Sequence, residues 1–166
     1  MKANKHPEEL QDRARLLEET PAVLRQLADG LTLENLQWKQ SSSEFSVLEH
    51  VCHLRDIERE GYAVRIEKLL SENHPWLADI DGDRLAAERN YNGQDFAVAL
   101  QDFTRARQEN VRVIKDLSSD QLHRGGTLER VGDMTLERLL LMMCEHDRDH
   151  RQALDNLRRH LLGKNS

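Results

Sequence analysis

Apolar residues recur at helical spacing along most of the chain, and they fall into four long segments. The first begins at His6-Pro7, where proline suits the first helical position, and Gly30 ends it. Its apolar positions are Leu10, Ala14, Leu17, Leu24 and Ala28. Thr20-Pro21 falls inside this stripe and predicts either a kink or a restart with Thr20 as the cap.

The other three segments have recognisable beginnings. Ser46-Val47-Leu48-Glu49 is a capping box and predicts a second helix that runs to about Ser71. A third helix is expected from near Asp95. Its apolar stripe is Phe96, Ala99, Leu100, Phe103, Ala106, Val113, Ile114 and Leu117. The fourth helix should begin at Thr135 and last to about Leu162.

The connections between these helices carry turn signals but no strand pattern. Residues 32–38 predict a short helical turn, and residues 118–133 predict a turn-rich connection. Residues 72–94 form a long connection that could hold a short helix around residues 84–89. Four long amphipathic helices predict an all-α four-helix bundle, with a crossover between the second and third helices.

The composition agrees with a helical protein and excludes some classes of binding partner. The 26 leucines outnumber the 12 valines and isoleucines, and only 8 glycines and 3 prolines interrupt the chain. Its 166 residues predict one domain, 1–166. No apolar run approaches the roughly 20 residues of a membrane helix, and the opening MKANKHPEELQDR has no apolar signal stretch. We therefore expect a cytoplasmic protein without a membrane partner, and the net charge of −6 argues against nucleic acid.

The fourth helix carries the clearest candidate chemistry. His146, Asp147 and His150 interrupt its inward stripe, which otherwise reads Leu136, Leu139, Leu140, Met143, Ala153, Leu154, Leu157 and Leu161. Imidazoles at positions i and i+4 share one helix face, which suits either a metal ion or two hydrogen-bonded core histidines. A zinc-protease motif would need a further histidine where Asn156 stands. A third ligand must therefore come from another helix.

The second helix offers two histidines, His50 and His53, and periodicity alone does not choose between them. The surrounding residues make the choice through a resemblance. Phe45-Ser46-x-x-Glu49-x-x-x-His53-Leu54-x-Asp56-x-Glu58 resembles the first motif of the DinB-like (DinB/YfiT) superfamily of metal-binding four-helix bundles. His146-Asp147-x-x-His150 resembles the second motif of that family. Phe45 stands where the family usually has tryptophan.

The resemblance extends over nearly the whole chain. Thr20-Pro21, Gly30-Leu31 and Trp38 fit the first helix and loop of the family, and a pattern between its two motifs matches the third helix. The residues of that pattern are Tyr91, Asp95, Ala99, Leu100, Phe103 and Arg107. The resemblance implies an up-down-down-up topology and a divalent metal bound by His53, His146 and His150.

Function follows from the resemblance only in outline. Family members include thiol-dependent S-transferases that use a low-molecular-weight thiol, and metal-dependent hydrolases; many are homodimers. Three imidazoles leave positions open for water or a small-molecule substrate, and the donor type favours Zn or Ni while leaving Fe, Co and Cu open. Candidates for orienting the rings are Asp147, Glu49 and Glu58, with Glu49 mainly a helix cap. The alternative is a non-catalytic metal-binding protein, or a dimeric structural or stress-response protein.

Overall fold

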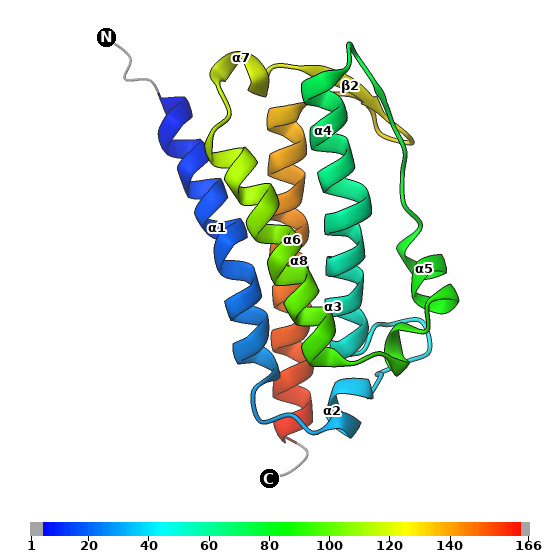
Figure 1. The fold of residues 1–166 in the computed structure, drawn as a ribbon. Helices are drawn as coiled ribbons and strands as arrows, with labels where there is room; N and C mark the ends of the chain where they lie inside the picture. The colour runs from blue at the N-terminus through cyan, green and yellow to red at the C-terminus, as the bar shows by residue number, and fades with distance from the viewer. Residues whose placement is uncertain (1–4, 164–166) are drawn as a thin grey trace.

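The computed structural model describes residues 5–163, and the ends of the expected domain, residues 1–4 and 164–166, lie outside the described residues. Four helical rods form the body of the protein (Figure 1). The rods are α1 (Lys5–Ala28), the contiguous run of α3 (Val47–Asp56), η1 (Ile57–Tyr62) and α4 (Ala63–Ser71), then α6 (Phe96–Lys115) and α8 (Leu136–Gly163). The four predicted helices are therefore confirmed.

The rods follow the up-down-down-up topology that the resemblance implied. The α3–α4 rod and α6 run in the same direction, opposite to α1 and α8 (Figure 1). Helix α6 packs against both α1 and α3, and α8 packs against the same two helices from the other side. The crossover between α4 and α6 holds two short helices, α5 (Gly82–Glu88) and the 3₁₀ turn η2 (Tyr91–Gly93).

Local capping signals mark the beginnings of two of the four rods. Ser46 accepts a hydrogen bond from the amide of Glu49 at 3.1 Å, and Glu49 accepts one from the amide of Ser46 at 2.9 Å, so the predicted capping box is present. The Asp95 side chain accepts from the Val98 amide at the start of α6, and Thr32 forms a capping box with Asn35 at the short helix α2 (Leu33–Gln37).

Helix α1 continues through Pro21, so the predicted restart with Thr20 as cap is wrong. Proline has no amide hydrogen, which leaves the carbonyl oxygen of Leu17 without its intrahelical partner. Arg107 of α6 donates to that oxygen at 2.9 Å. A long-range hydrogen bond thus replaces the missing local one, and Thr20 is free to use its hydroxyl inside the bundle.

The expectation of no strands is also wrong in detail, because a small sheet lies at one end of the bundle. Its strands are β1 (Trp76–Leu77), β2 (Gly125–Leu128) and β3 (Gly132–Thr135), in the order β1-β2-β3. The last two form an antiparallel hairpin after the short helix α7 (Ser119–Leu122), and β1 pairs with β2 in parallel. Gly126 permits this pairing, since a Cβ there would lie 2.8 Å from the Pro75 carbonyl oxygen.

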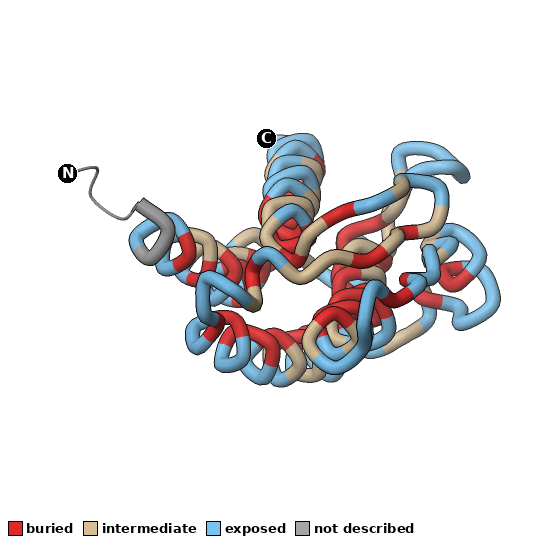
Figure 2. Tube along the Cα trace, turned by 90° about the horizontal axis from the view of Figure 1, so that it is seen from above, coloured by how far each residue is buried: buried red, intermediate tan, exposed pale blue. Residues whose placement is uncertain are grey.

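Two apolar clusters fill the bundle, and a polar layer separates them. Along α8 the first cluster ends at Cys144 and the second resumes at Leu154; along α6 they meet between Phe103 and Val111. Buried positions face the space that the rods enclose (Figure 2). The buried polar side chains of the layer are Thr20, Glu58, Arg107, Asn110 and Asp147. Among the described residues, no helix is long and apolar enough to cross a membrane.

Candidate metal centre

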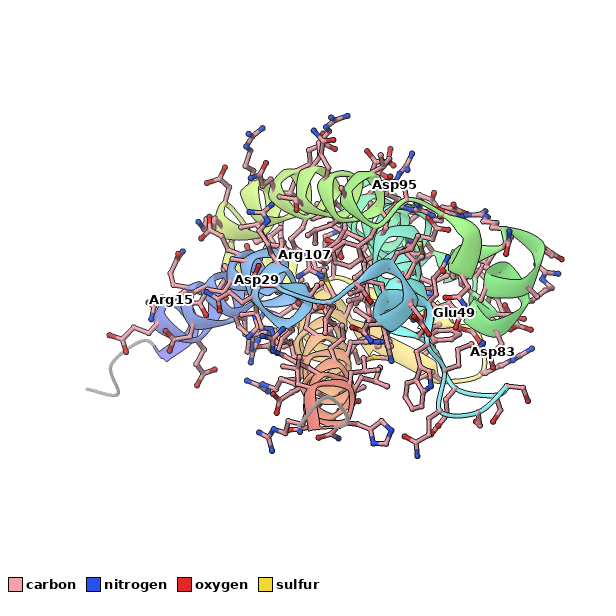
Figure 3. The ribbon with its side chains drawn as sticks, turned by 90° about the horizontal axis from the view of Figure 1, so that it is seen from below. Arg15, Asp29, Glu49, Asp83, Asp95 and Arg107 are labelled. Carbon is pink, nitrogen blue, oxygen red and sulfur yellow. The ribbon has the colours of Figure 1, made fainter. Side chains whose placement is uncertain are left out.

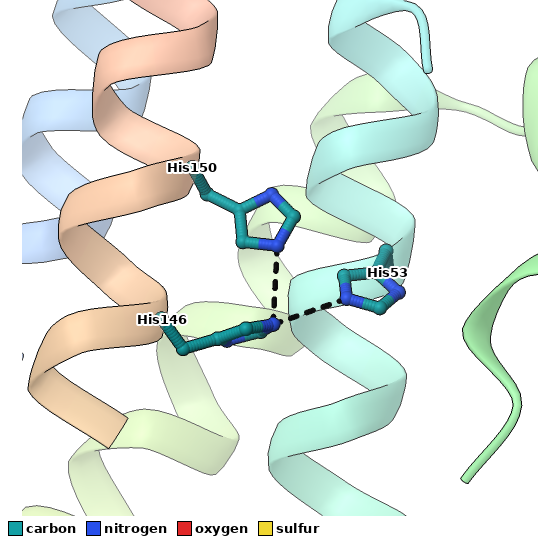
Figure 4. A group of neighbouring side chains, drawn as sticks. All are labelled: His53, His146 and His150. Carbon is teal, nitrogen blue, oxygen red and sulfur yellow. Dashed lines mark hydrogen bonds between the residues drawn. The ribbon is translucent and has the colours of Figure 1, made fainter. Parts of the chain in front are cut away.

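Three imidazoles meet inside the bundle at the level of the polar layer (Figure 4). His53 comes from α3, whereas His146 and His150 stand one turn apart on α8. The Nε2 atom of His146 lies 3.2 Å from the Nε2 atom of His53 and 3.1 Å from that of His150. One ring nitrogen from each residue falls within 4.8 Å of both others. The structure thus brings together the three histidines that the sequence comparison paired with the family motifs.

The local sequence explains why these rings converge. The i,i+4 spacing puts His146 and His150 on the side of α8 that faces α3. Asp147, next to His146, is fully buried, so this face of α8 turns toward the interior. All three imidazoles are half-buried, so none of them is sealed completely inside the bundle.

Hydrogen bonding alone does not satisfy this group. A neutral imidazole has one protonated nitrogen, so the single Nε2 of His146 can donate to one neighbour only. Burial disfavours adding a proton: it lowers the pKa of His53 to about 3, and it lowers the pKa of His146 and of His150 as well. A divalent cation would accept all three lone pairs at once.

Two of the three nitrogen spacings match those around a single ion, and the third lies within 4.8 Å. Imidazole nitrogens held about 2.0 to 2.1 Å from one metal lie roughly 2.9 to 3.4 Å apart, depending on the coordination angle. The two Nε2–Nε2 distances of 3.1 and 3.2 Å fall inside that range. The donor set and its spacing therefore suit a divalent transition metal.

Packing rather than hydrogen bonding holds the Nδ1 edge of the His53 ring. Its Nδ1 atom is buried and has no hydrogen-bond partner. Phe45 packs on the ring at a centroid distance of 5.4 Å. On the other side lies Gly82, the first residue of α5, where a Cβ would approach the His53 Cε1 atom to 2.6 Å. The long crossover therefore has a role at the site, since it covers a ligand.

His50 is the residue that sequence reasoning left undecided, and the structure gives it a separate position. Its Nδ1 atom lies 2.7 Å from the Nδ1 atom of His150, on the side of that ring away from His146. Burial lowers the pKa of His50 to about 4. The sequence signal that could have placed His50 near the metal ligands was its position one helical turn before His53 on the same helix.

A pocket opens beside His50. Its volume is about 370 Å³, within the range of small-molecule sites. Phe45, Ala153 and Leu157 give it an apolar wall, while Gln40 and Asn156 add side-chain amides.

The three acidic candidates have other partners. Asp147 accepts hydrogen bonds from Thr20 and from both terminal nitrogens of Arg107, and Glu58 pairs with the remaining edge of Arg107. Figure 3 shows Arg107 among the helices, with Arg15 on the periphery. Glu49 accepts from the Ser46 amide and from Lys39. A role of these carboxylates in orienting the imidazoles stays a prediction, although Asp147 opposes the lowering of the His146 pKa.

Comparisons with known proteins identify the family and the fold of this chain. The sequence profile of the DinB superfamily matches residues 16–154. Among solved structures, YfiT from Bacillus subtilis, described as a probable metal-dependent hydrolase with an unusual four-helix bundle topology, matches with a TM-score of 0.86. The two sequences are 22% identical, and the match covers 93% of this chain and 88% of that one. No curated protein sequence matches significantly.

Proposed function

Because this chain belongs to the DinB superfamily, we propose that it is a metal-dependent enzyme that holds one divalent ion on His53, His146 and His150. The reaction that we favour is hydrolysis of a small molecule. The observation that carries the proposal is the convergence of three Nε2 atoms from two helices on one point. The description of YfiT as a probable metal-dependent hydrolase supports the reaction class.

A set of three protein ligands favours catalysis over a purely structural ion. Structural zinc sites are closed by four protein ligands, whereas catalytic sites keep a position for water or substrate. The described residues offer three ligands, and all three are partly exposed. When bound, a divalent ion supplies Lewis acidity and brings the pKa of water or of a thiol towards neutrality.

The pocket beside His50 provides room for the substrate. Its wall of Phe45, Ala153 and Leu157 would take an apolar portion, and the amides of Gln40 and Asn156 would hydrogen-bond a polar one. We therefore propose a small organic substrate that carries both kinds of group.

Thiol-dependent S-transfer is the second candidate. A thiolate is a good ligand for the metals that suit three imidazoles, so a low-molecular-weight thiol is a chemically reasonable co-substrate.

We also propose a cytoplasmic homodimer, with light scattering as the test of the oligomeric state. A non-catalytic metal-binding or structural protein would bind the ion but turn over neither substrate class.

The test begins with metal analysis of the purified protein. We expect one ion per chain in the protein as purified, with Zn or Ni found more often than Fe, Co or Cu. His150→Ala should abolish stoichiometric binding. His160→Ala is the matched control, because His160 lies on the same helix, is exposed and packs on Trp38 instead. Full metal content in His150→Ala would refute the three-histidine site.

The loaded protein is then assayed on two panels. One holds esters, amides and other hydrolysable small molecules, and the other pairs low-molecular-weight thiols with electrophiles. Turnover on the first panel that is lost in His150→Ala supports the hydrolase. Turnover only with added thiol supports S-transfer, and no turnover on either panel favours the binding protein.

A further inference from the structure

His50 and His150 share a hydrogen bond between like atoms. Their Nδ1 atoms lie 2.7 Å apart, and the two rings meet nearly at right angles, with an interplanar angle of 78°. The Nε2 atom on the opposite side of the His150 ring faces His146 at 3.1 Å. One ring therefore connects the candidate metal centre to a histidine that is not among its ligands.

The chemistry of a metal-binding imidazole fixes the direction of this bond. An ion at Nε2 of His150 uses the lone pair there, which leaves the proton of the neutral ring on Nδ1. That Nδ1–H can only donate, so the Nδ1 atom of His50 must accept. His50 then carries its own proton on Nε2.

We propose that His50 is a positioning residue that sets the orientation and tautomer of His150 and offers its Nε2–H to the adjoining pocket. The inference rests on the proposed metal site and adds a residue to it. His53 provides the contrast, since its Nδ1 atom is buried without a partner. His150 is thus the ligand whose second nitrogen is held by a hydrogen bond.

The fold keeps His50 in place from its own side. It belongs to the first turn of α3, where its amide donates to the carbonyl oxygen of the cap residue Ser46 at 3.0 Å. The ring of Phe45 meets it edge-on at 5.5 Å. A capped helix end and an aromatic neighbour therefore restrict the ring before any metal binds.

The same ring lines the pocket of about 370 Å³. A molecule in that pocket would contact His50, one ring away from the ligand His150. Acceptance at Nδ1 from His150 holds the neutral His50 ring in the tautomer that carries Nε2–H, the donor that we propose for a carbonyl or other acceptor on the bound molecule.

The test compares two substitutions of His50 in the full-length protein. Asn places a carbonyl oxygen near the position of the imidazole Nδ1, so His50→Asn keeps an acceptor for His150. His50→Leu removes it. His74→Leu is the control, because His74 is exposed and bonds to Thr127 and Asp133 outside the site. The measurements are Zn²⁺ affinity by chelator competition and the visible spectrum of the Co²⁺-loaded protein.

We expect His50→Leu to bind one ion about 10- to 100-fold more weakly, with an altered Co²⁺ spectrum. His50→Asn should recover most of the affinity and the wild-type spectrum, a rescue that a purely packing role of the ring would not produce. In the Zn²⁺-loaded wild type, ¹⁵N spectra should show His50 protonated on Nε2.

Two results would overturn the inference while leaving the proposed function intact. One is a His50→Leu protein with wild-type affinity and spectrum. The other is a His50 ring protonated on Nδ1 in the loaded protein. A wild-type protein that binds no ion would remove the proposed function and this inference together.

Discussion

Arg107 donates two hydrogen bonds to Asp147, from Nη1 at 2.5 Å and from Nη2 at 2.9 Å. Asp147 directly follows the metal-ligand candidate His146 in the sequence. The other donors of the guanidinium reach Glu58 and the Leu17 carbonyl oxygen, so all five N–H groups have acceptors. This cluster joins α1, the π-helical turn η1, α6 and α8 in the polar layer. It therefore sets the rotation of α8 that turns His146 and His150 inward.

Arg107→Leu should destabilise the fold by about 3 to 5 kcal/mol, because two buried carboxylates would lose their cationic partner. Urea unfolding of the metal-free protein measures this. Arg105→Leu, an exposed arginine of the same helix, should stay close to wild type. Equal stability of the two variants would contradict a central role for the cluster.

Removing the metal should leave the protein folded. The two apolar clusters and the Arg107 cluster use none of the three ligand nitrogens, so a chelated sample should keep its helical circular dichroism. Added metal should raise the unfolding free energy by about 4 kcal/mol when the free ion exceeds its Kd a thousandfold. A chain that unfolds on chelation would instead indicate a structural metal.

Gly82→Ala should weaken metal binding about tenfold through displacement of a ligand ring. The new Cβ would stand 2.6 Å from Cε1 and 2.8 Å from Nδ1 of His53, closer than packing allows. Chelator competition measures the effect. Gly163→Ala is the control, since a Cβ there meets nothing within 4 Å. Unchanged affinity in Gly82→Ala would show that the crossover does not position His53.

The metal-free protein should lose stability as the pH falls below about 6.5. An unfolded histidine binds its proton near that pH, whereas burial lowers the folded pKa of His53 to about 3 and that of His50 to about 4. The unfolded state therefore takes up protons that the folded state excludes. The stability is fully present above pH 6.5 and is lost as the pH falls towards the folded pKa values.

Each pH unit within that window costs about 1.4 kcal/mol for each such imidazole. Urea unfolding at pH 7, 6 and 5 measures the slope. His53→Asn should flatten it, while His74→Asn, at an exposed position, should not. A slope that His53→Asn leaves unchanged would assign the acid sensitivity to other groups.

The sequence by itself determined the helices, because their signals are local. Apolar residues at helical spacing, the Ser46–Glu49 capping box and the Asp95 cap act within a turn or two of the chain. The ordered motifs also identified His53, His146 and His150, although periodicity alone left His50 and His53 open.

Only the tertiary structure decided the features that depend on residues far apart in the chain. The replacement partner of the Leu17 carbonyl oxygen is Arg107, 90 positions away, and the partner of His150 is His50, 100 positions away. The pairing of β1 with β2 and the packing of Gly82 against His53 also join residues that are not neighbours in the sequence. Such contacts form only when the rods pack against one another, so no local sequence pattern predicts them. Packing therefore decided which partner each buried polar side chain has.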